Sequence, residues 1–428
     1  MDKHNIIDLM LKAAMKMKPI LRRFLPMNVL RGIKRRIIDA SIAKMNARPL
    51  KLRFIRSANP DGINLIGYIK AEMGLGQSCR LVAGGLETAG IPFTVYNYEQ
   101  ASIMRYNDQT WAHKITNTTP YNINLFHLNP YEMPSAFLNI GRGVWRKRYN
   151  IAFWLWELEE FPAEWEEAFK LVDEVWAPSE FTSNCVRKVT DKPVHTMPYA
   201  LRAPECGEYR RRHFELPENL TLFLCMYDCN STMARKNPIG AVKAFKKAFG
   251  RDNVNVGIIV KVNNAKDSDI VQIKTELDGY PGVYIFSEVM DKVKVNGLIA
   301  CADVLISLHR AEGFGLVPAE AMFLGTPVVS TNWSSTTEFM NHDVTCLVDY
   351  EFVEIKESDG PYPSGSRWAE PNINQAADYL KKLYDDEEYR NNLAKKAKQY
   401  IEGKFAPESM ALLLSKRIAE IYDTVASS

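Results

Sequence analysis

The sequence lacks the features that mark a membrane-spanning chain or a repeat protein. No apolar run reaches the roughly 18 residues that a spanning helix needs, and there is no internal repeat or low-complexity tract. Lysines interrupt the first apolar residues and no small-residue cleavage site follows, so we expect no secretory signal peptide. A length of 428 residues is enough for two domains, each with its own core.

Cysteine is sparse, and its spacing excludes the common metal and disulfide patterns. The 7 cysteines are odd in number, and none belongs to a CxxC motif. Cys225 and Cys229 have three residues between them in an apolar strand pattern, which is poor metal geometry. We therefore expect buried thiols in a reducing cytoplasm.

Acidic residues are scarce in one segment, residues 1–53. It holds 14 Lys or Arg against 3 Asp, a net charge of +11, which leaves −8 for the rest of a chain whose total is +3. Apolar and basic residues alternate there in one or two helical patterns, broken near Pro19 and Pro26. We expect residues 1–45 to bind an anionic membrane surface. A helix that packs on a domain is the alternative, and nucleic acid is disfavoured because Phe24 is the only aromatic residue before Phe54.

Strand and helix patterns alternate through the rest of the chain, as in α/β proteins with parallel sheets. Expected strands in the first half are residues 63–68, 91–96, 123–126, 151–154 and 196–199. Expected strands in the second half are residues 222–228, 256–262, 283–286, 304–307 and 327–330. The polar, proline-containing stretch 201–218 is the expected linker between the halves.

The most informative stretch runs from Ser307 to Thr331, SLHRAEGFGLVPAEAMFLGTPVVST. It reads as a strand, a glycine-rich turn, a helix and a second strand, and the amides that begin the helix suit an anion or sugar oxygens. Glu312 lies on the turn and Glu320 about two turns into the helix, where both carboxylates can accept hydrogen bonds from sugar hydroxyls. A helix that merely begins near an acidic residue is the alternative interpretation.

A second basic motif, Arg235-Lys236, precedes the expected helix 241–249. A planar guanidinium, an ammonium and the free amides of a helix N-terminus together suit a diphosphate. Solvated basic side chains are the alternative.

HRAEGFGLVPAEAMFLGTPVV resembles the donor-site signature of the retaining glycosyltransferases with the GT-B fold, the group 1 or family 4 class. WLWEL at 154–158 and VWAPSEF at 175–181 are similar to further motifs of that class, and the resemblance covers roughly residues 63–422. It implies two Rossmann-like α/β domains facing each other across a cleft. The expected parts are a basic helical arm (1–53), an acceptor domain (54–204), a nucleotide-sugar donor domain (205–403) and a helix that crosses back (404–428).

The same resemblance implies roles for individual residues. The catalytic residues would be Glu312 on the donor sugar, His127 from the opposite domain, and Arg235 and Lys236 on the departing diphosphate. The donor-binding residues would be Glu320 on the ribose hydroxyls, with Gly313, Phe314, Gly315, Leu316, Gly74, Gly76 and Lys261. The acceptor-binding residues would be Glu157, Trp156, Asn129 and Arg80, while Ser287 and Glu288 are candidates for contacts to the base. No obligatory metal or other cofactor is implied.

Several of these motifs also fit other interpretations. Gly74-x-Gly76 after a strand is typical of a dinucleotide site, with Glu99 as the ribose-binding acid, but Cys79 takes the place of the third glycine. Asp267-Ser268-Asp269 has the D-x-D form of some metal-binding transferases, and we interpret it as a solvated turn. His127 can equally be structural, and Trp156 can equally belong to the core.

We therefore expect an enzyme that moves a hexose from a nucleotide diphosphate sugar to a glycan or lipid-linked glycan. Its expected place is the cytoplasm, peripheral at the inner face of the cell membrane, in bacterial surface-polysaccharide synthesis. The alternatives are a GT-B-like nucleotide-sugar epimerase, an NAD-dependent enzyme that uses the Gly74 loop, and a non-catalytic scaffold.

Overall fold

The computed structural model describes residues 49–99 and 105–426, together with single residues between 32 and 47. Most of the basic arm, and with it the expected membrane contact, lies outside the described residues. At the end of the arm, Met45 is buried in the core of the first half of the chain. The amide of Asn46 donates to Oε2 of Glu167 at 3.0 Å, so the end of the arm packs on that half.

The first half of the chain forms a parallel sheet of six strands in the order β2-β1-β3-β4-β5-β6. Its strands are β1 (Ile63–Gly67), β2 (Phe93–Asn97), β3 (Ile123–His127), β4 (Tyr149–Phe153), β5 (Glu174–Ala177) and β6 (Val194–Thr196). Its helices are α3 (Gly74–Thr88), α4 (Met133–Ile140) and α5 (Glu180–Arg187). Every residue of β1 and β3 is buried, because helices cover both faces of such a sheet.

The second half repeats this plan with the strand order β12-β11-β10-β7-β8-β9, again parallel. Its strands are β7 (Thr221–Asp228), β8 (Val256–Asn263), β9 (Val283–Phe286), β10 (Val304–Ser307), β11 (Val328–Thr331) and β12 (Cys346–Val348). Its helices are α6 (Met233–Lys236), α7 (Pro238–Phe249), α8 (Asp267–Glu276), α9 (Lys292–Cys301), α10 (Leu316–Leu324), α11 (Ile373–Asp385) and α12 (Glu387–Lys404). The predicted fold class, two parallel α/β sheets in two halves, is confirmed.

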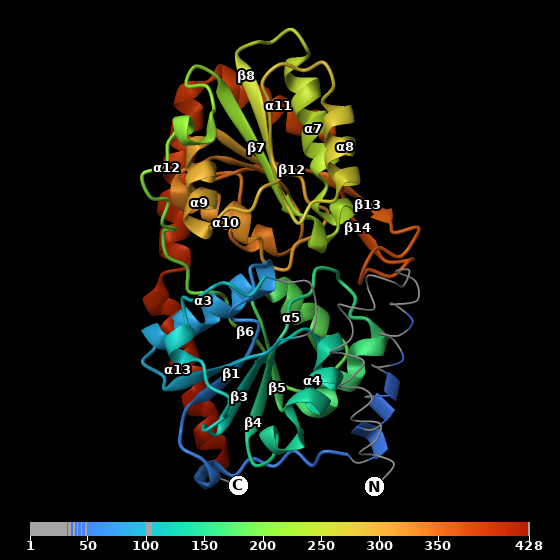
Figure 1. Cartoon of the computed structure of the whole chain (residues 1–428), viewed down its shortest axis with the longest axis vertical. Coiled ribbons are helices and arrows are strands. Elements are labelled where there is room, and N and C mark those ends of the chain that lie inside the picture. The colour runs from blue at the N-terminus through green and yellow to red at the C-terminus, as the bar shows by residue number, and fades with distance from the viewer. Residues whose placement is uncertain are drawn as a thin grey trace.

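The two halves are stacked end to end, and the last helix, α13 (Pro407–Ala426), runs back along the first half (Figure 1). Arg417 on α13 pairs with the fully buried Glu174 of β5, with Nη2 2.5 Å from Oε2. Nearer the end of α13, the hydroxyl of Tyr422 accepts from the backbone N–H of Gly62 at 3.1 Å and donates to Asn122 at 2.9 Å. These contacts hold the end of the chain on the sheet of the first half.

Three segments of the second half form helices or strands that the sequence did not predict. The Arg235-Lys236 pair lies in the short helix α6, not in a loop, and α7 begins at Pro238 because the Asn237 side chain caps Gly240 N at 3.1 Å. The expected turn at Asp267–Asp269 begins α8. Residues Arg367–Pro371, at the end of a stretch rich in glycine and proline, form a strand, β14, which pairs antiparallel with β13 (Tyr350–Glu354).

The segment after the WLWEL motif, Ala163–Leu171, is a 3-10 helix. The last strand is Val194–Thr196, so the expected residues 197–199 lie beyond its end. Tyr199 is thereby placed after the carboxyl end of the strand, where residues of parallel sheets reach a ligand.

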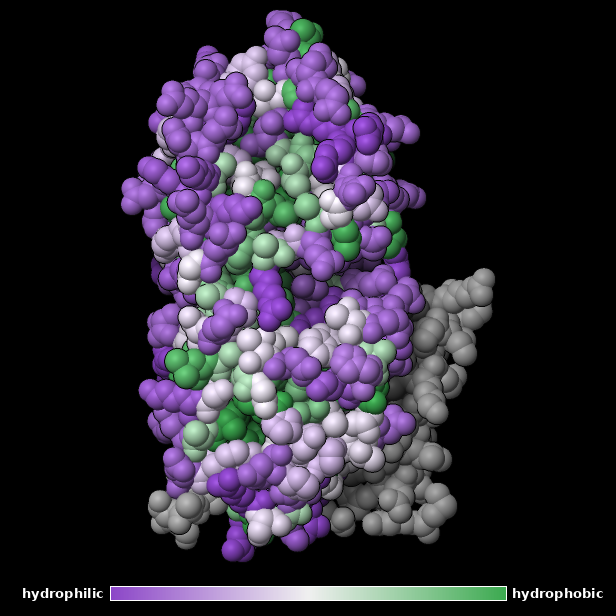
Figure 2. Space-filling model, turned by 90° about the vertical axis from the view of Figure 1, so that its left-hand side faces the viewer, coloured by the Kyte–Doolittle hydropathy of each residue, from purple (hydrophilic) through white to green (hydrophobic). Residues whose placement is uncertain are grey.

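Polar side chains cover most of the face in Figure 2, and apolar groups gather there in smaller patches. Within the described part of the chain, no helix combines the length and the apolar character needed to span a bilayer.

We predict that Arg417→Ala lowers the stability of the first half by about 3 kcal/mol, because it leaves the buried Glu174 carboxylate without its ion-pair partner. The measurement is the midpoint of thermal unfolding. The matched control is Lys416→Ala, an exposed neighbour on the same helix, which should change the midpoint little. Equal midpoints for the two variants would contradict this role of the pair.

Candidate active site

A cavity of about 1640 Å³ opens between the two halves, where the carboxyl ends of both sheets face each other. Open α/β sheets place ligands at these ends because the loops that follow the strands converge there. The lining residues that follow strands of the first half include Gly74, Asn129 and Tyr199. Those that follow strands of the second half include Asn230, Asn264, Ser287, Glu288 and Glu312.

The two adjacent basic residues of α6 reach this cavity from the second half. Arg235 is only 3% exposed; its Nη1 donates to the carbonyl of Ala311 at 2.7 Å. Its Nε has no hydrogen-bond partner among the described residues. Thr232, in a left-handed conformation with φ 58°, caps α6 through a 3.4 Å hydrogen bond to Arg235 N. A β-branched residue with positive φ is strained, and such strain gathers at functional sites.

Glu312 is the counter-charge of both cations. It forms an ion pair with Lys236, and its Oε2 lies 3.5 Å from Nη1 of Arg235. Burial would raise the pKa of Glu312, but the charges of Lys236 and Arg235 outweigh it and hold the pKa at about 2. Burial also lowers the pKa of Lys236, against the opposing effect of Glu312. The cavity therefore contains an ionised carboxylate between two cations.

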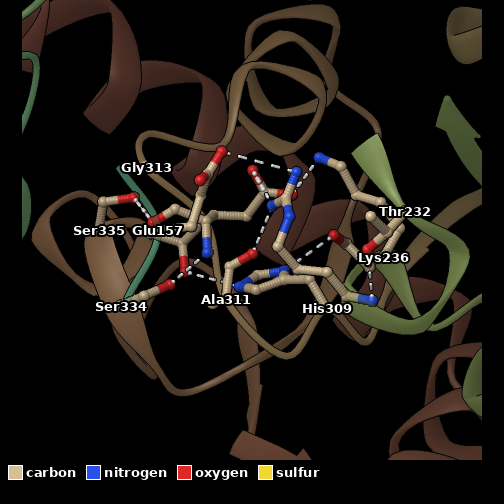
Figure 3. A network of polar contacts seen from close by, with 12 residues as sticks. Glu157, Thr232, Lys236, His309, Ala311, Gly313, Ser334 and Ser335 are labelled. Carbon is tan, nitrogen blue, oxygen red and sulfur yellow. Dashed lines mark hydrogen bonds and ion pairs between the residues drawn. The ribbon is translucent and has the colours of Figure 1, made fainter. Parts of the chain in front are cut away.

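The turn that carries Glu312 is fixed by hydroxyl groups. Ser334 Oγ accepts from the backbone N–H of Glu312 at 2.9 Å, and Ser335 Oγ donates to its carbonyl at 2.7 Å. In Figure 3, Ser334 and Ser335 lie on one side of this turn, and Thr232 and Lys236 lie on the other. The side chain of Glu312 is thus held by its backbone as well as by its charge partners.

His309 lies beneath this turn, and the sequence analysis did not single it out, although it belongs to the HRAEGFG motif. It is fully buried, with Nδ1 3.1 Å from Ser307 Oγ and Nε2 3.3 Å from Thr336 Oγ1. Burial lowers its pKa to about 4, despite the nearby carboxylate of Glu312. A neutral imidazole at neutral pH therefore supports the turn without adding a third cation.

The glycines of the turn are required for close packing. A Cβ on Gly313 would lie 3.1 Å from the carbonyl O of Trp156, and Ser179 Oγ donates to the Gly313 carbonyl at 2.9 Å. Gly315 has φ 95°, and a Cβ there would lie 2.5 Å from Thr336. Gly315 is also the N-cap residue of α10 and provides no side-chain cap, so the first amides of that helix, including that of Leu316, are left for a ligand.

Phe314 lines the cavity but belongs mainly to the core between the halves. Its ring packs against Tyr199 of the first half at 4.7 Å between centroids. It also packs against Phe339 at 5.5 Å and Phe405 at 5.4 Å. The aromatic contact places the glycine-rich turn against the end of the first sheet.

Glu320 lies on α10, and its carboxylate faces the cavity. Its Oε2 is 2.6 Å from Nζ of Lys292, the first residue of α9. Lys292 was not among the predicted site residues, because 27 residues separate it from Glu320 and no local sequence pattern links the two.

The Gly74 loop of the first half lies on the opposite wall of the cavity. Gly74 begins α3, lines the cavity and has open space where a Cβ would be. Gly76 is buried instead, since a Cβ there would lie 2.1 Å from the carbonyl O of Ala71. The prediction that Gly76 contacts the donor is corrected, because it serves the packing of α3 on the loop before it.

Two predicted acceptor-binding residues, Asn129 and Arg80, also line the cavity. Asn129 follows β3, and its backbone N–H donates to Glu132 at 3.2 Å. Arg80 donates to the carbonyls of Ile69 and Ala71, both at 2.9 Å, and its Nε lies 3.3 Å from Asp108. Arg80 therefore chiefly stabilises the loop that precedes α3.

Glu157 joins the two halves at the centre of the site. Its Oε1 lies 3.7 Å from Nη2 of Arg235, and its Oε2 accepts from the hydroxyl of Tyr362 at 3.2 Å. Tyr362 belongs to the loop between β13 and β14, and its ring stacks on Trp156 at 5.4 Å. The β13–β14 hairpin therefore bridges both halves over Arg235.

The positions of the side chains do not support ligand contacts for three predicted residues, Trp156, His127 and Lys261. Trp156 lines the cavity, but its ring packs between Tyr362 and Trp165, at 5.4 and 4.6 Å, and its Nε1 donates to the Glu160 carbonyl. A sugar therefore cannot stack on the Trp156 ring in this arrangement.

His127 and Lys261 are fully buried and do not line the cavity. His127 Nε2 lies 2.7 Å from Ser78 Oγ, its ring stacks on Phe153, and burial lowers its pKa to about 3. Lys261 Nζ donates to Asn263 Oδ1 at 2.7 Å and to the Glu288 carbonyl at 3.0 Å. The first residue supports α3, and the second holds the loops after β8 and β9 together.

The comparisons with known proteins agree with this arrangement. Residues 230–400, which carry Arg235, Lys236, Glu312 and Glu320, match the family model of glycosyl transferases group 1. No curated protein matches the chain by sequence.

Solved structures share the fold over most of the chain. Sucrose-phosphate synthase from Thermosynechococcus elongatus has a TM-score of 0.63 and 13% identity, covering 85% of this chain and 100% of its own. A glycosyltransferase from Rickettsia africae has a TM-score of 0.59 and 14% identity, covering 84% and 99%. Anabaena HepE, solved in complex with UDP and glucose, has a TM-score of 0.58 and 14% identity, covering 84% and 100%. The predicted GT-B fold is confirmed.

We predict that Glu312→Gln destabilises the protein at neutral pH by about 3 kcal/mol, and that this difference disappears in acid. Because the pKa of Glu312 is lowered from 4.5 to about 2, its carboxylate contributes its full stability above pH 4.5. That contribution is lost as the pH falls through 2. The measurement is the unfolding midpoint of both proteins from pH 7 down to pH 2, the range in which the contribution of the Glu312 carboxylate should be lost.

The control for the pH series is Glu354→Gln, a change at an exposed position on β13. Its midpoint should follow that of the unaltered protein throughout. A constant difference between Glu312→Gln and the unaltered protein at every pH would contradict the ionised state of Glu312.

Proposed function

We propose that the protein is a retaining glycosyltransferase that moves a hexose from a nucleotide diphosphate sugar to a glycan or lipid-linked glycan. The observation that carries the proposal is the grouping of Arg235, Lys236, Glu312 and Glu320 around one cavity between two Rossmann-like halves. The family match over residues 230–400 and the UDP and glucose bound to Anabaena HepE support a nucleotide-sugar donor.

The departing nucleoside diphosphate gains negative charge as its bond to the anomeric carbon breaks. Stabilisation of such charge by fixed donors is usually the largest electrostatic contribution to a reaction of this kind. Arg235 and Lys236, with the uncapped amides at Gly315 and Leu316, supply two positive charges and free N–H donors on one side of the cavity. This arrangement supports a reaction without an obligatory metal, because the protein itself supplies the positive charge.

Glu312 has a role that changes when the donor binds. In the structure its carboxylate and that of Glu157 neutralise Arg235 and Lys236. A diphosphate would share these cations, and Glu312 would then face the donor sugar and the positive charge that develops at its anomeric carbon. Glu320 would hold the ribose hydroxyls.

The acceptor would enter from the side of the first half. Asn129 and Glu157 present polar groups there, and the Tyr362 loop closes that side of the cavity. Closure excludes water, which favours transfer to an acceptor over hydrolysis of the donor. The basic arm would hold the protein at the inner face of the cell membrane, where lipid-linked glycans of bacterial surface polysaccharides are assembled.

We predict that one nucleoside diphosphate stabilises the protein without added metal. The measurement is a thermal-shift screen with UDP, GDP, dTDP, ADP and CMP, with and without magnesium, and with NAD as a comparison. A ligand at 100 times its dissociation constant adds about 2.7 kcal/mol of stability. A response to NAD alone would contradict the proposal and return attention to the Gly74 loop.

The same screen with variants tests the residues named above. Lys236→Ala and Glu320→Ala should each lower the affinity for the identified nucleotide about tenfold or more, because each removes a charged hydrogen-bonding group. Lys243→Ala, at an exposed position on α7, is the control and should bind as the unaltered protein does. Unchanged binding in both site variants would show that the nucleotide binds elsewhere.

We predict that the full chain co-sediments with vesicles that contain phosphatidylglycerol and not with neutral phosphatidylcholine vesicles. Each Lys or Arg near an anionic surface contributes about 1 kcal/mol, and salt weakens this attraction. Replacing Lys12, Lys16, Arg22 and Arg23 with glutamine should release the protein. Equal binding to both kinds of vesicle, or to neither, would contradict an electrostatic role for residues 1–45.

A further inference from the structure

One ion pair in the cavity has no part in the mechanism described above. Nζ of Lys292 lies 2.6 Å from Oε2 of Glu320. Lys292 begins α9, Glu320 lies in the second turn of α10, and these helices pack against each other. Both side chains line the cavity, so the pair faces the space that a donor would occupy.

Helix stability does not account for a lysine at this position. Asp291 caps α9 by accepting from the backbone N–H of Lys294 at 2.8 Å, which makes Lys292 the first residue of the helix. The first turn contains no acidic residue. The positive end of the helix dipole disfavours an ammonium there, so the contact with Glu320 is the interaction that compensates.

The pair is open to the cavity on one side. The side chain of Lys292 is 42% exposed and that of Glu320 is 10% exposed. Oε1 of Glu320 has no hydrogen-bond partner among the described residues. The ammonium of a lysine carries three N–H donors, of which this ion pair uses one. The pair therefore presents a fixed acceptor and additional donors side by side.

Two neighbouring hydroxyl groups match this combination better than a phosphate or a base does. A hydroxyl both donates and accepts, so one hydroxyl can donate to Oε1 of Glu320 while its neighbour accepts from Lys292. A phosphate would be attracted by Lys292 but repelled by the carboxylate beside it. The chemistry of the pair thus favours a cis-diol.

We propose that Lys292 is a specificity-determining residue, which orients Glu320 and binds the 2′- and 3′-hydroxyls of the donor ribose together with it. This inference rests on the proposed function, which assigns the ribose to Glu320. It goes further in requiring a ribonucleotide: a donor that lacks the 2′-hydroxyl would leave one member of the pair unsatisfied.

The test compares UDP with 2′-deoxy-UDP by isothermal titration calorimetry, using the unaltered full chain and Lys292→Met. We expect the unaltered protein to bind UDP about tenfold or more tightly than 2′-deoxy-UDP, the effect of one hydrogen bond to a charged group. In Lys292→Met this preference should fall below about threefold. Lys292 is 42% exposed, and in Lys292→Met the Glu320 carboxylate still faces the open cavity, so we expect the variant to remain folded, and its unfolding midpoint checks this.

Two matched variants separate a specific role from a structural one. Lys294→Met makes the same substitution two positions along α9, at a residue that does not line the cavity, and should keep the full preference. Lys292→Arg keeps the positive charge and N–H donors and should retain most of it.

Two outcomes would overturn the inference while leaving the proposed function intact. The first is a Lys292→Met variant that keeps the preference for UDP, or that loses UDP and 2′-deoxy-UDP equally, as a phosphate contact would. The second is a nucleotide screen in which dTDP alone binds, since dTDP has no 2′-hydroxyl. Absence of binding by every nucleoside diphosphate would instead overturn both the inference and the proposed function.

Discussion

The site depends on one buried carboxylate, that of Glu312, which lies between two cations of α6. Taking three charged groups out of water is unfavourable unless each is paired and hydrogen-bonded. Here Lys236 and Arg235 neutralise Glu312, while the hydroxyls of Ser334 and Ser335 fix its backbone. The cluster joins α6 to the glycine-rich turn, so neither can move far without leaving a buried charge unpaired.

The same cluster joins the two halves of the molecule. Arg235 reaches Glu157 of the first half, and Tyr362 holds the second oxygen of that carboxylate. Elsewhere at the interface, Glu338 accepts from the backbone N–H groups of Glu180 and Phe181, at 2.9 and 2.8 Å. The cavity is therefore enclosed by polar contacts that include its own charged residues, and a bound anion would compete directly with them. An anion bound there would therefore also act on the contacts between the two halves.

The β13–β14 hairpin stands apart from the two six-stranded sheets. The hairpin is a separate two-stranded sheet that follows β12 in the chain. Its loop, between Ser358 and Pro363, lines the cavity. Arg367, the first residue of β14 after this loop, donates to Glu159 of the first half at 2.9 Å. The WLWEL motif and the hairpin, which are distant in sequence, thus form one contact through Trp156, Glu157 and Tyr362. Their aromatic rings serve this contact and leave the recognition of ligands to the polar groups beside them.

The sequence alone determined the two parallel sheets, because their strands are buried on both faces and appear as apolar runs between turn signals. It also determined the strand, turn and helix unit that carries Glu312, Gly315 and Glu320, since all three lie within nine residues of one another. The tertiary structure decided which distant side chains meet. His127 ends β3 and Lys261 lies close to the end of β8, where ligand-binding residues are common, yet their polar atoms contact protein partners. Conversely, Lys292 and Tyr362 have no local signal, because their contacts depend on how helices and a hairpin pack across many residues. Sequence periodicity indicates which face of an element is buried. It does not indicate which polar group of another element contacts that face.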